Sequence, residues 1–462
     1  MDMQNELELL RRQLSEALER LARLEKENHQ LKEENERLKR ILGNNSSNSS
    51  LPPSTDQKGK PANTYNSRGK NGKSGKKAGA QSGHKGKHLS KDFVEQKIRD
   101  GSFVHRVEDV GDISRPYVSR YVLDIEVRTV AREIRIHADE SGKFNVPPEL
   151  GAEVSYGDEL RAIAVTLYGV GIMSNDSICE FLNAISGDSL AISTGSVYGF
   201  LHDFAEKAEN ECQTIEQHLG EESVLCTDGT TITTNGKQTY IRNFSSDEYV
   251  LYKSSDKKNL ADLHKMDLLE HTKATLMHDH ETALYHFGSN HGECNVHVVR
   301  YLRKSEEETK NPWCRQMIDF LHEMNVTRKD VQMKGDCAFS VEQVAQFEQR
   351  YDQILEEGRE QNRNTQGYYA RKAEVRLLNR MEKYKINHLL FIHDFSVPFS
   401  NNMSERDLRV CKKRDKLSGG FRTAGGRDMF CTTMSFLETL KRQGKNVFRN
   451  IVAVLSGTPV LA

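Results

Sequence analysis

The first stretch of the chain carries apolar residues at a seven-residue period. Between residues 6 and 42 one core position of the heptad also holds Asn28 and Asn35. A buried asparagine at this position favours a parallel two-stranded coil, because the two amides bond across the axis. We therefore expect residues 1–42 to form a coiled-coil helix that dimerises, with a single exposed surface helix as the alternative. The other core residues are Leu7, Leu14, Leu21 and Leu42 at the first position and Leu10, Ala17, Leu24, Leu31 and Leu38 at the second.

The apolar pattern stops at Gly43, and residues 43–90 are polar and rich in glycine and lysine. From residue 57 to residue 91 there are ten Lys or Arg residues and no Asp or Glu. Such a segment cannot bury a core, so we expect a disordered basic linker that contacts DNA phosphates. A plain solvated linker is the alternative. The lysines expected at DNA are Lys70, Lys73, Lys76, Lys77 and Lys85.

Two further segments follow the linker. Residues 91–150 are rich in β-branched and aromatic residues, which predicts a small β-rich domain. Residues 151–220 show capped helical patterns beginning near residues 158, 174 and 193. A short helix, a turn and a capped helix is the outline of a helix-turn-helix, although many helical bundles share it. We expect a helical region here that binds DNA.

From residue 221 the pattern changes to strands. Residues 223–228 and 274–279 each form an apolar run that ends on an acid, and Asn235-Gly236 predicts a hairpin turn. A charged helical stretch spans about 305–395, and Asn402 or Ser404 then caps a helix. This order predicts a ribonuclease-H-like domain over 221–440 with a helical insertion, followed by a tail at 441–462. The fold class expected overall is α/β and multidomain.

Composition narrows the class further. The chain has 462 residues, a net charge of -1 and 8 Cys without a Cys-x-x-Cys pair. Scattered cysteines are typical of reduced thiols, not of a disulfide framework. The acidic start has no apolar run behind it, and no stretch approaches the roughly 20 apolar residues that span a bilayer. We expect a cytoplasmic, nucleoid-associated protein without a signal peptide or a membrane partner.

Three acids could meet in such a fold: Asp228, Asp279 and Glu405. Phosphodiester cleavage needs two divalent cations about 4 Å apart, and Mg²⁺ prefers a few carboxylate oxygens. Spacing alone leaves the second position open to other acids. Those competitors are Asp256, Asp262 and Asp267.

Several blocks resemble transposases of the insertion-sequence-66 family from about residue 40 onward. They lie at 45–54, 79–86, 227–230, 278–280, 294–300, 397–409 and 414–426. The resemblance implies a DDE-type DNA transposase with Asp228, Asp279 and Glu405 as catalytic metal ligands for Mg²⁺ or Mn²⁺. It further implies double-stranded DNA as partner, with accessory transposition proteins as possible partners, while the heptads at 1–42 are the basis for expecting a homodimer or larger assembly. A catalytically inactive DNA-binding regulator is the alternative, and a coiled-coil scaffold does not explain these blocks.

The chain departs from the family in two places. Members carry a cysteine-based zinc module after the 79–86 block, whereas residues 91–150 contain no Cys, so no zinc is expected there. His278 and His280 flank Asp279, where the family has Gly and aromatic residues. The spacing of His291, Cys294 and His297 permits a metal site, but we expect Cys294 and His297 to support the carboxylates. Basic residues after Glu405 are expected to hold DNA phosphates: Arg406, Arg409, Lys412, Lys413 and Arg414.

Overall fold

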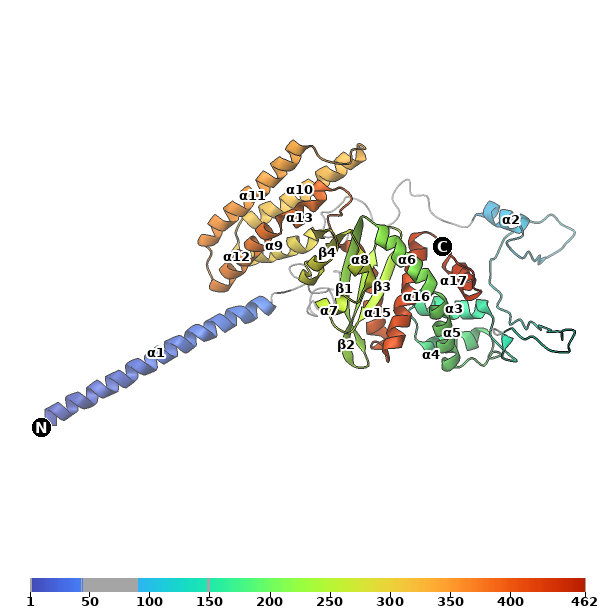
Figure 1. Cartoon of the computed structure of the whole chain (residues 1–462), viewed down its shortest axis with the longest axis horizontal. Helices are drawn as coiled ribbons and strands as arrows, with labels where there is room; N and C mark the ends of the chain where they lie inside the picture. The colour runs from blue at the N-terminus through green and yellow to red at the C-terminus, as the bar shows by residue number, and fades with distance from the viewer. Residues whose placement is uncertain (1, 43, 45–89, 148–149, 462) are drawn as a thin grey trace. The chain divides into compact units, whose positions relative to one another are not determined.

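The computed structural model describes residues 2–42, 44, 90–147 and 150–461 (Figure 1). The chain divides into two compact units. One comprises residues 1–56, 135–184 and 190–462, and the other comprises 57–134 and 185–189. The expected linker contacts, Lys70 to Lys85, lie outside the described residues and stay a prediction.

Residues Asp2–Leu42 form one continuous helix, α1. The heptad leucines whose side chains are described are about half to two-thirds exposed, for example Leu24 at 56% and Leu31 at 63%. The expected helix is confirmed. Its pairing with a second copy stays a prediction, which these exposed leucines support because an apolar stripe is stabilised when a partner covers it.

The β-rich domain expected at 91–150 is wrong. Helix α2, Lys91–Arg99, opens this segment, and the Ser90 side chain caps it by accepting from the Phe93 amide at 3.2 Å. Among the described residues from 100 to 147 no strand forms. Val118, Val122 and similar side chains are largely exposed. High β-propensity reflects packing on a paired, half-buried surface, and without paired neighbours it does not make a strand.

A mixed five-stranded sheet lies at the centre of the other unit. Its strands are β1 (Val224–Thr234), β2 (Lys237–Ser245), β3 (Val250–Ser255), β4 (Thr275–His278) and β5 (Asn290–Glu293), in the order β3-β2-β1-β4-β5. The first three are antiparallel neighbours, and β4 runs parallel to β1 and to β5. Asn235 and Gly236 both have positive φ, which matches the expected hairpin turn.

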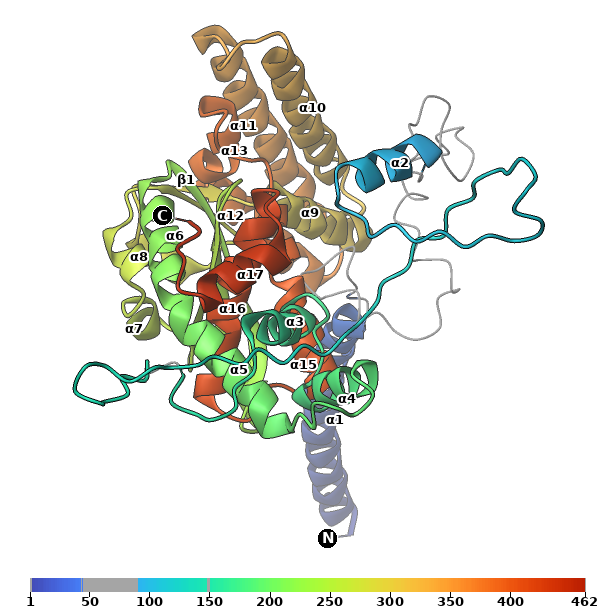
Figure 2. The same ribbon diagram turned by 90° about the vertical axis from the view of Figure 1, so that its right-hand side faces the viewer.

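Helices pack on both sides of this sheet (Figures 1 and 2). The expected helical region holds α3 (Asp158–Gly169), α4 (Asn175–Ile185), α5 (Thr194–Lys207) and α6 (Glu209–Glu221). Helix α16 (Ala424–Arg442) packs against β3, and α17 (Val447–Leu455) packs against α3 and α5. The expected tail at 441–462 is therefore wrong, because α17 buries Ile451, Val454 and Leu455 in this core. Short elements α7 (Leu260–Leu263), α8 (Asp267–His271) and η5 (Thr282–His286) join the strands.

The helical insertion is present and begins earlier than expected. It comprises α9 (Asn295–Thr309), α10 (Trp313–Met333), α11 (Val341–Arg363), α12 (Tyr368–Lys383) and α13 (Lys385–His393). Trp313, Phe320 and Tyr351 are fully buried in its core. Gly358 faces Trp313 so closely that a Cβ would lie 2.7 Å from the indole ring, so only glycine fits. The chain then returns to the sheet through α14 (Asn402–Asp407) and α15 (Arg409–Ser418).

Candidate active site

Asp228 lies on β1, and Asp279 directly follows β4, the parallel neighbour of β1. Cys226 on β1 pairs with Met277 on β4, and each acid follows its paired residue by two positions. Asp279 comes one residue after the end of β4, and its negative charge acts on Asp228. The register of one strand pair therefore brings together two acids that are 51 positions apart in the chain.

The surroundings of Asp228 disfavour the charged form of its carboxylate. Its carboxylate accepts from the Gly229 amide at 2.7 Å, and its own amide donates to the Asn243 side chain at 3.2 Å. Burial and the nearby negative charge of Asp279 raise the pKa of Asp228 to about 6. A site that destabilises its own carboxylate when empty of cations is suited to binding positive charge.

Hydrogen bonds of Asn401 hold the helix that carries Glu405 next to Asp228. The buried Asn401 side chain donates to the Thr227 carbonyl at 2.9 Å, next to Asp228. The Asn401 amide donates to Cys294 Sγ at 3.2 Å. Because the Asn401 carbonyl accepts from the Glu405 amide at 3.2 Å, the first turn of α14 begins directly on β1. Cys294 thus supports the helix that carries the third acid.

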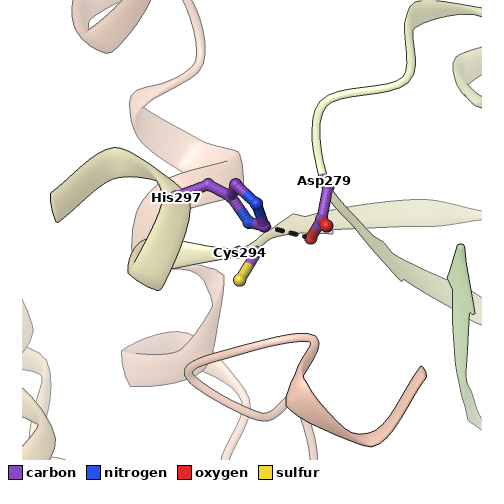
Figure 3. A group of neighbouring side chains, drawn as sticks. All are labelled: Asp279, Cys294 and His297. Carbon is purple, nitrogen blue, oxygen red and sulfur yellow. Dashed lines mark ion pairs between the residues drawn. The ribbon is translucent and has the colours of Figure 1, made fainter. Parts of the chain in front are cut away.

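His297 lies between the other two acids. Its Nδ1 is 3.3 Å from Asp279 Oδ1 and 3.9 Å from Glu405 Oε1. Figure 3 shows Asp279, Cys294 and His297 converging. Arg300 lies 2.9 Å from His297 Nε2, and since a guanidinium only donates, Nε2 accepts and the ring proton belongs on Nδ1. The Nδ1 proton of His297 therefore faces the two carboxylates at ion-pair distance, and the supporting role expected for His297 stays a prediction.

The donor set fits a hard divalent cation. Asp279 Oδ1 and Glu405 Oε1 are buried atoms without a hydrogen-bond partner among the described residues. Carboxylate oxygens that are buried and unsatisfied are costly unless a cation or water completes them. Asp279, Cys294 and His297 also offer ligand atoms within 4.8 Å of one another. With its proton on Nδ1, His297 is an N–H donor there, so a thiolate-imidazole site is disfavoured.

A comparison with known protein families finds a match that includes these residues. The model of the Transposase IS66 family matches residues 178–429, more than half of the chain. The chain belongs to the Transposase IS66 family. The match contains Asp228, Asp279 and Glu405. A second model, a family of unknown function (DUF6444), matches residues 1–90. No curated protein matches the chain.

Membership has general consequences. The IS66 transposase family is a family of DNA-binding enzymes, and DDE-type transposases generally use divalent metal ions. In the described part of the chain, no helix has both the length and the apolar character needed to cross a membrane.

The competing acids are engaged elsewhere in this family member. Asp256 pairs with Arg427 at 2.9 Å. The Asp262 carboxylate accepts a hydrogen bond from the Lys257 backbone amide at 2.9 Å and forms an ion pair with Lys265 at 2.6 Å. Asp267 is an exposed residue of α8, with 80% of its side chain accessible. Of the four acids considered for the second position, only Asp279 lies against Asp228 in the structure.

The basic residues after Glu405 divide into two groups. Arg406 precedes α15 and is exposed. Four more exposed residues lie at helical spacing on one face of α15, with no ion pair to a described residue: Arg409, Lys412, Lys413 and Lys416. Arg414 differs. It is 8% exposed, donates to the Met173 carbonyl at 2.8 Å and lies 4.7 Å above the Tyr168 ring. Its expected role in holding DNA is wrong, because its guanidinium joins α15 to α3.

Sequence reasoning missed the residues that hold the acids in place. Asp407 on α14 accepts from Ser245 at 2.7 Å and from Arg442 at 2.6 Å, so it ties α14 to β2 and α16. Asn401 and Asp407 lie inside the 397–409 block, and their position beside Glu405 was a usable signal. Glu293 on β5 contacts His280, the residue after Asp279. No sequence signal pointed to Glu293, since its strand is short, polar and without apolar alternation.

Proposed function

We propose that this chain is a DNA transposase that cleaves phosphodiesters at the ends of an insertion sequence and joins them to target DNA. The observation that carries the proposal is the meeting of Asp228, Asp279 and Glu405, from three elements far apart in the chain, within the family match. Asp279 Oδ1 and Glu405 Oε1 are buried and accept no hydrogen bond from a described residue, which supports a cation as their partner.

Each acid has a role in this proposal. Asp228, Asp279 and Glu405 hold Mg²⁺ or Mn²⁺, and two ions fit the reaction class. When bound, divalent cations activate the attacking oxygen and stabilise the leaving oxygen of a phosphodiester. His297 orients the Asp279 and Glu405 carboxylates through its Nδ1 proton, and Arg300 holds the His297 ring. Cys294 sets the start of α14 through Asn401.

The architecture supports a ribonuclease-H-like catalytic domain. Three antiparallel strands followed by two parallel ones, in the order β3-β2-β1-β4-β5, place the first acid on β1 and the second after β4. The third acid lies on α14, which packs against β1 and β2. The helices α9 to α13 form an insertion between the second and third acids.

DNA and a second copy are the proposed partners. The exposed face of α15 begins four residues after Glu405, so phosphates held there lie beside the carboxylates. Helix α1 supplies the apolar stripe for a parallel homodimer. DNA binding by the helical region at 151–220 and DNA contacts from the basic linker remain predictions.

The test uses purified full-length protein and DNA fragments that carry the terminal repeats flanking its gene. With Mg²⁺ or Mn²⁺ the wild type is expected to nick and join these ends. Asp228→Asn, Asp279→Asn and Glu405→Gln are each expected to lose at least a thousandfold in rate while still binding DNA. Asp267→Asn, an exposed acid outside the site, is the matched control and keeps full activity. A wild type that binds the ends and never cuts them is the inactive regulator, and full strand transfer by Asp228→Asn refutes the assignment of the acids.

A further inference from the structure

The turn that follows Asp279 contacts the two strands that flank the β1–β4 pair. The residue after it, His280, has its Nδ1 2.5 Å from Glu293 Oε1 on β5. The next residue, Glu281, accepts from Arg242 on β2 at 2.6 Å. Two consecutive side chains therefore reach in opposite directions to the strands on either side of β1 and β4. Asp279 directly precedes these two anchored residues.

His280 holds its place in an unfavourable backbone conformation. Its φ is 59°, the left-handed region, where a Cβ crowds the backbone and glycine is preferred. Strained residues of this kind persist where the surrounding structure demands them, and they gather at functional sites. A glycine would adopt this φ without strain but would have no imidazole to contact Glu293.

Glu293 extends the anchor into the helical insertion. Its side chain is 1% exposed and meets four partners. Besides His280, Tyr285 donates to it at 2.5 Å, Arg380 of α12 donates at 3.0 Å, and His388 of α13 lies 3.1 Å away. Burial opposes its charge, yet the surrounding donors hold the pKa of Glu293 far below its ordinary value. One buried carboxylate thus connects the Asp279 turn to two helices of the insertion.

We propose that His280 is a positioning residue, whose contact with Glu293 holds the Asp279 carboxylate in the geometry that binds the divalent cation and couples that geometry to the insertion. The inference rests on the proposed function, because it takes Asp279 as a metal ligand. Groups that orient a ligand from outside the metal's own coordination shell commonly change metal affinity by 10- to 100-fold when they are lost.

A glycine substitution separates positioning from general stabilisation. In full-length His280→Gly the backbone strain disappears together with the imidazole. Lys310→Gly is the matched control, since Lys310 is exposed at the end of α9 with a φ of 60°. Lys310→Gly is expected to keep the wild-type melting temperature or exceed it, whereas His280→Gly also loses a partner of the buried Glu293 carboxylate and is expected to melt below Lys310→Gly. Titration with Mn²⁺, with free ion counted by electron paramagnetic resonance, is expected to show about tenfold weaker binding for His280→Gly alone.

A second variant tests the pair. Glu293→Gln removes the charge that His280 contacts, and its loss of Mn²⁺ affinity is expected to be non-additive with that of His280→Gly. Wild-type affinity in His280→Gly, with Mn²⁺ bound normally by the wild type, overturns the positioning role. A wild type that binds no Mn²⁺ overturns the proposed function itself, so the two failures are distinct.

Discussion

Replacing Asp228 by asparagine is expected to stabilise the metal-free protein. The carboxylate of Asp228 is destabilised by burial and by Asp279, which raise its pKa from 3.8 to about 6. An asparagine keeps the oxygen that accepts from the Gly229 amide at 2.7 Å. It removes the charge that repels Asp279. The variant that abolishes the proposed chemistry is therefore expected to be the more stable protein.

The sign and size of this stabilisation follow from the difference between the folded and unfolded pKa of Asp228. A folded-state pKa above the unfolded value means that the folded protein holds the Asp228 proton more tightly. The tighter binding of this proton adds fully to the free energy of unfolding below about pH 4, and the gain is lost as the pH rises through 6. The difference between 3.8 and about 6 corresponds to about 3 kcal/mol, an upper value because the site is partly open to water. Asp228→Asn should recover about 1–3 kcal/mol at pH 7.5 and almost nothing at pH 4.

Thermal unfolding in chelator at the two pH values measures this directly. Asp228→Asn is expected to melt several degrees above the wild type at pH 7.5 and to match it near pH 4. Addition of Mn²⁺ is expected to raise the melting temperature of the wild type and leave that of the variant nearly unchanged. Asp267→Asn, outside the site, should shift neither. An Asp228→Asn protein that is less stable than wild type at pH 7.5 would refute the reasoning.

Two further predictions concern the partners. Deleting residues 1–42 is expected to halve the mass measured by light scattering, because it removes the heptad stripe; an unchanged mass contradicts the coiled-coil dimer. The double variant Lys412→Ala/Lys413→Ala is expected to weaken DNA binding and to lower the slope of log affinity against log salt by about 2. Arg414→Met, a buried position, should change stability and leave that slope as in wild type. An unaltered slope in the lysine variant would exclude this face of α15 as a phosphate contact.

Each of the three acids belongs to a local pattern in the chain, and the family resemblance is what selected them as the expected metal ligands. Asp228 ends an apolar run, Asp279 ends another, and Glu405 lies in the first turn of a helix. The caps expected for that helix, Asn402 or Ser404, are wrong, because both lie inside it and its N-cap residue is Asn401. Which acid partners Asp228 depends on strand register, a non-local property that the structure supplies through the Cys226–Met277 pair. The exposed face of α15 follows from helical spacing, and that spacing also sets Arg414 apart from Lys412 and Lys413.

Other features had misleading signals or none. The β-branched run at 117–130 carries strand propensity, but a strand also requires a partner, which propensity cannot supply. Helix α17 was overlooked although Asn446 caps it and Ile451, Val454 and Leu455 have helical spacing. Glu293 lies on a four-residue polar strand, and its partners come from α12 and α13, nearly a hundred residues away. Contacts over that separation leave no local periodicity.

The central claim is that Asp228, Asp279 and Glu405 together hold the divalent cation. Crystals of the full chain soaked in Mn²⁺ and measured at the manganese absorption edge test it most directly. The account predicts one or two anomalous peaks within about 2.5 Å of oxygens from all three carboxylates. Peaks that are absent, or that lie on Cys294 and His297 without Asp228 and Glu405, would contradict it.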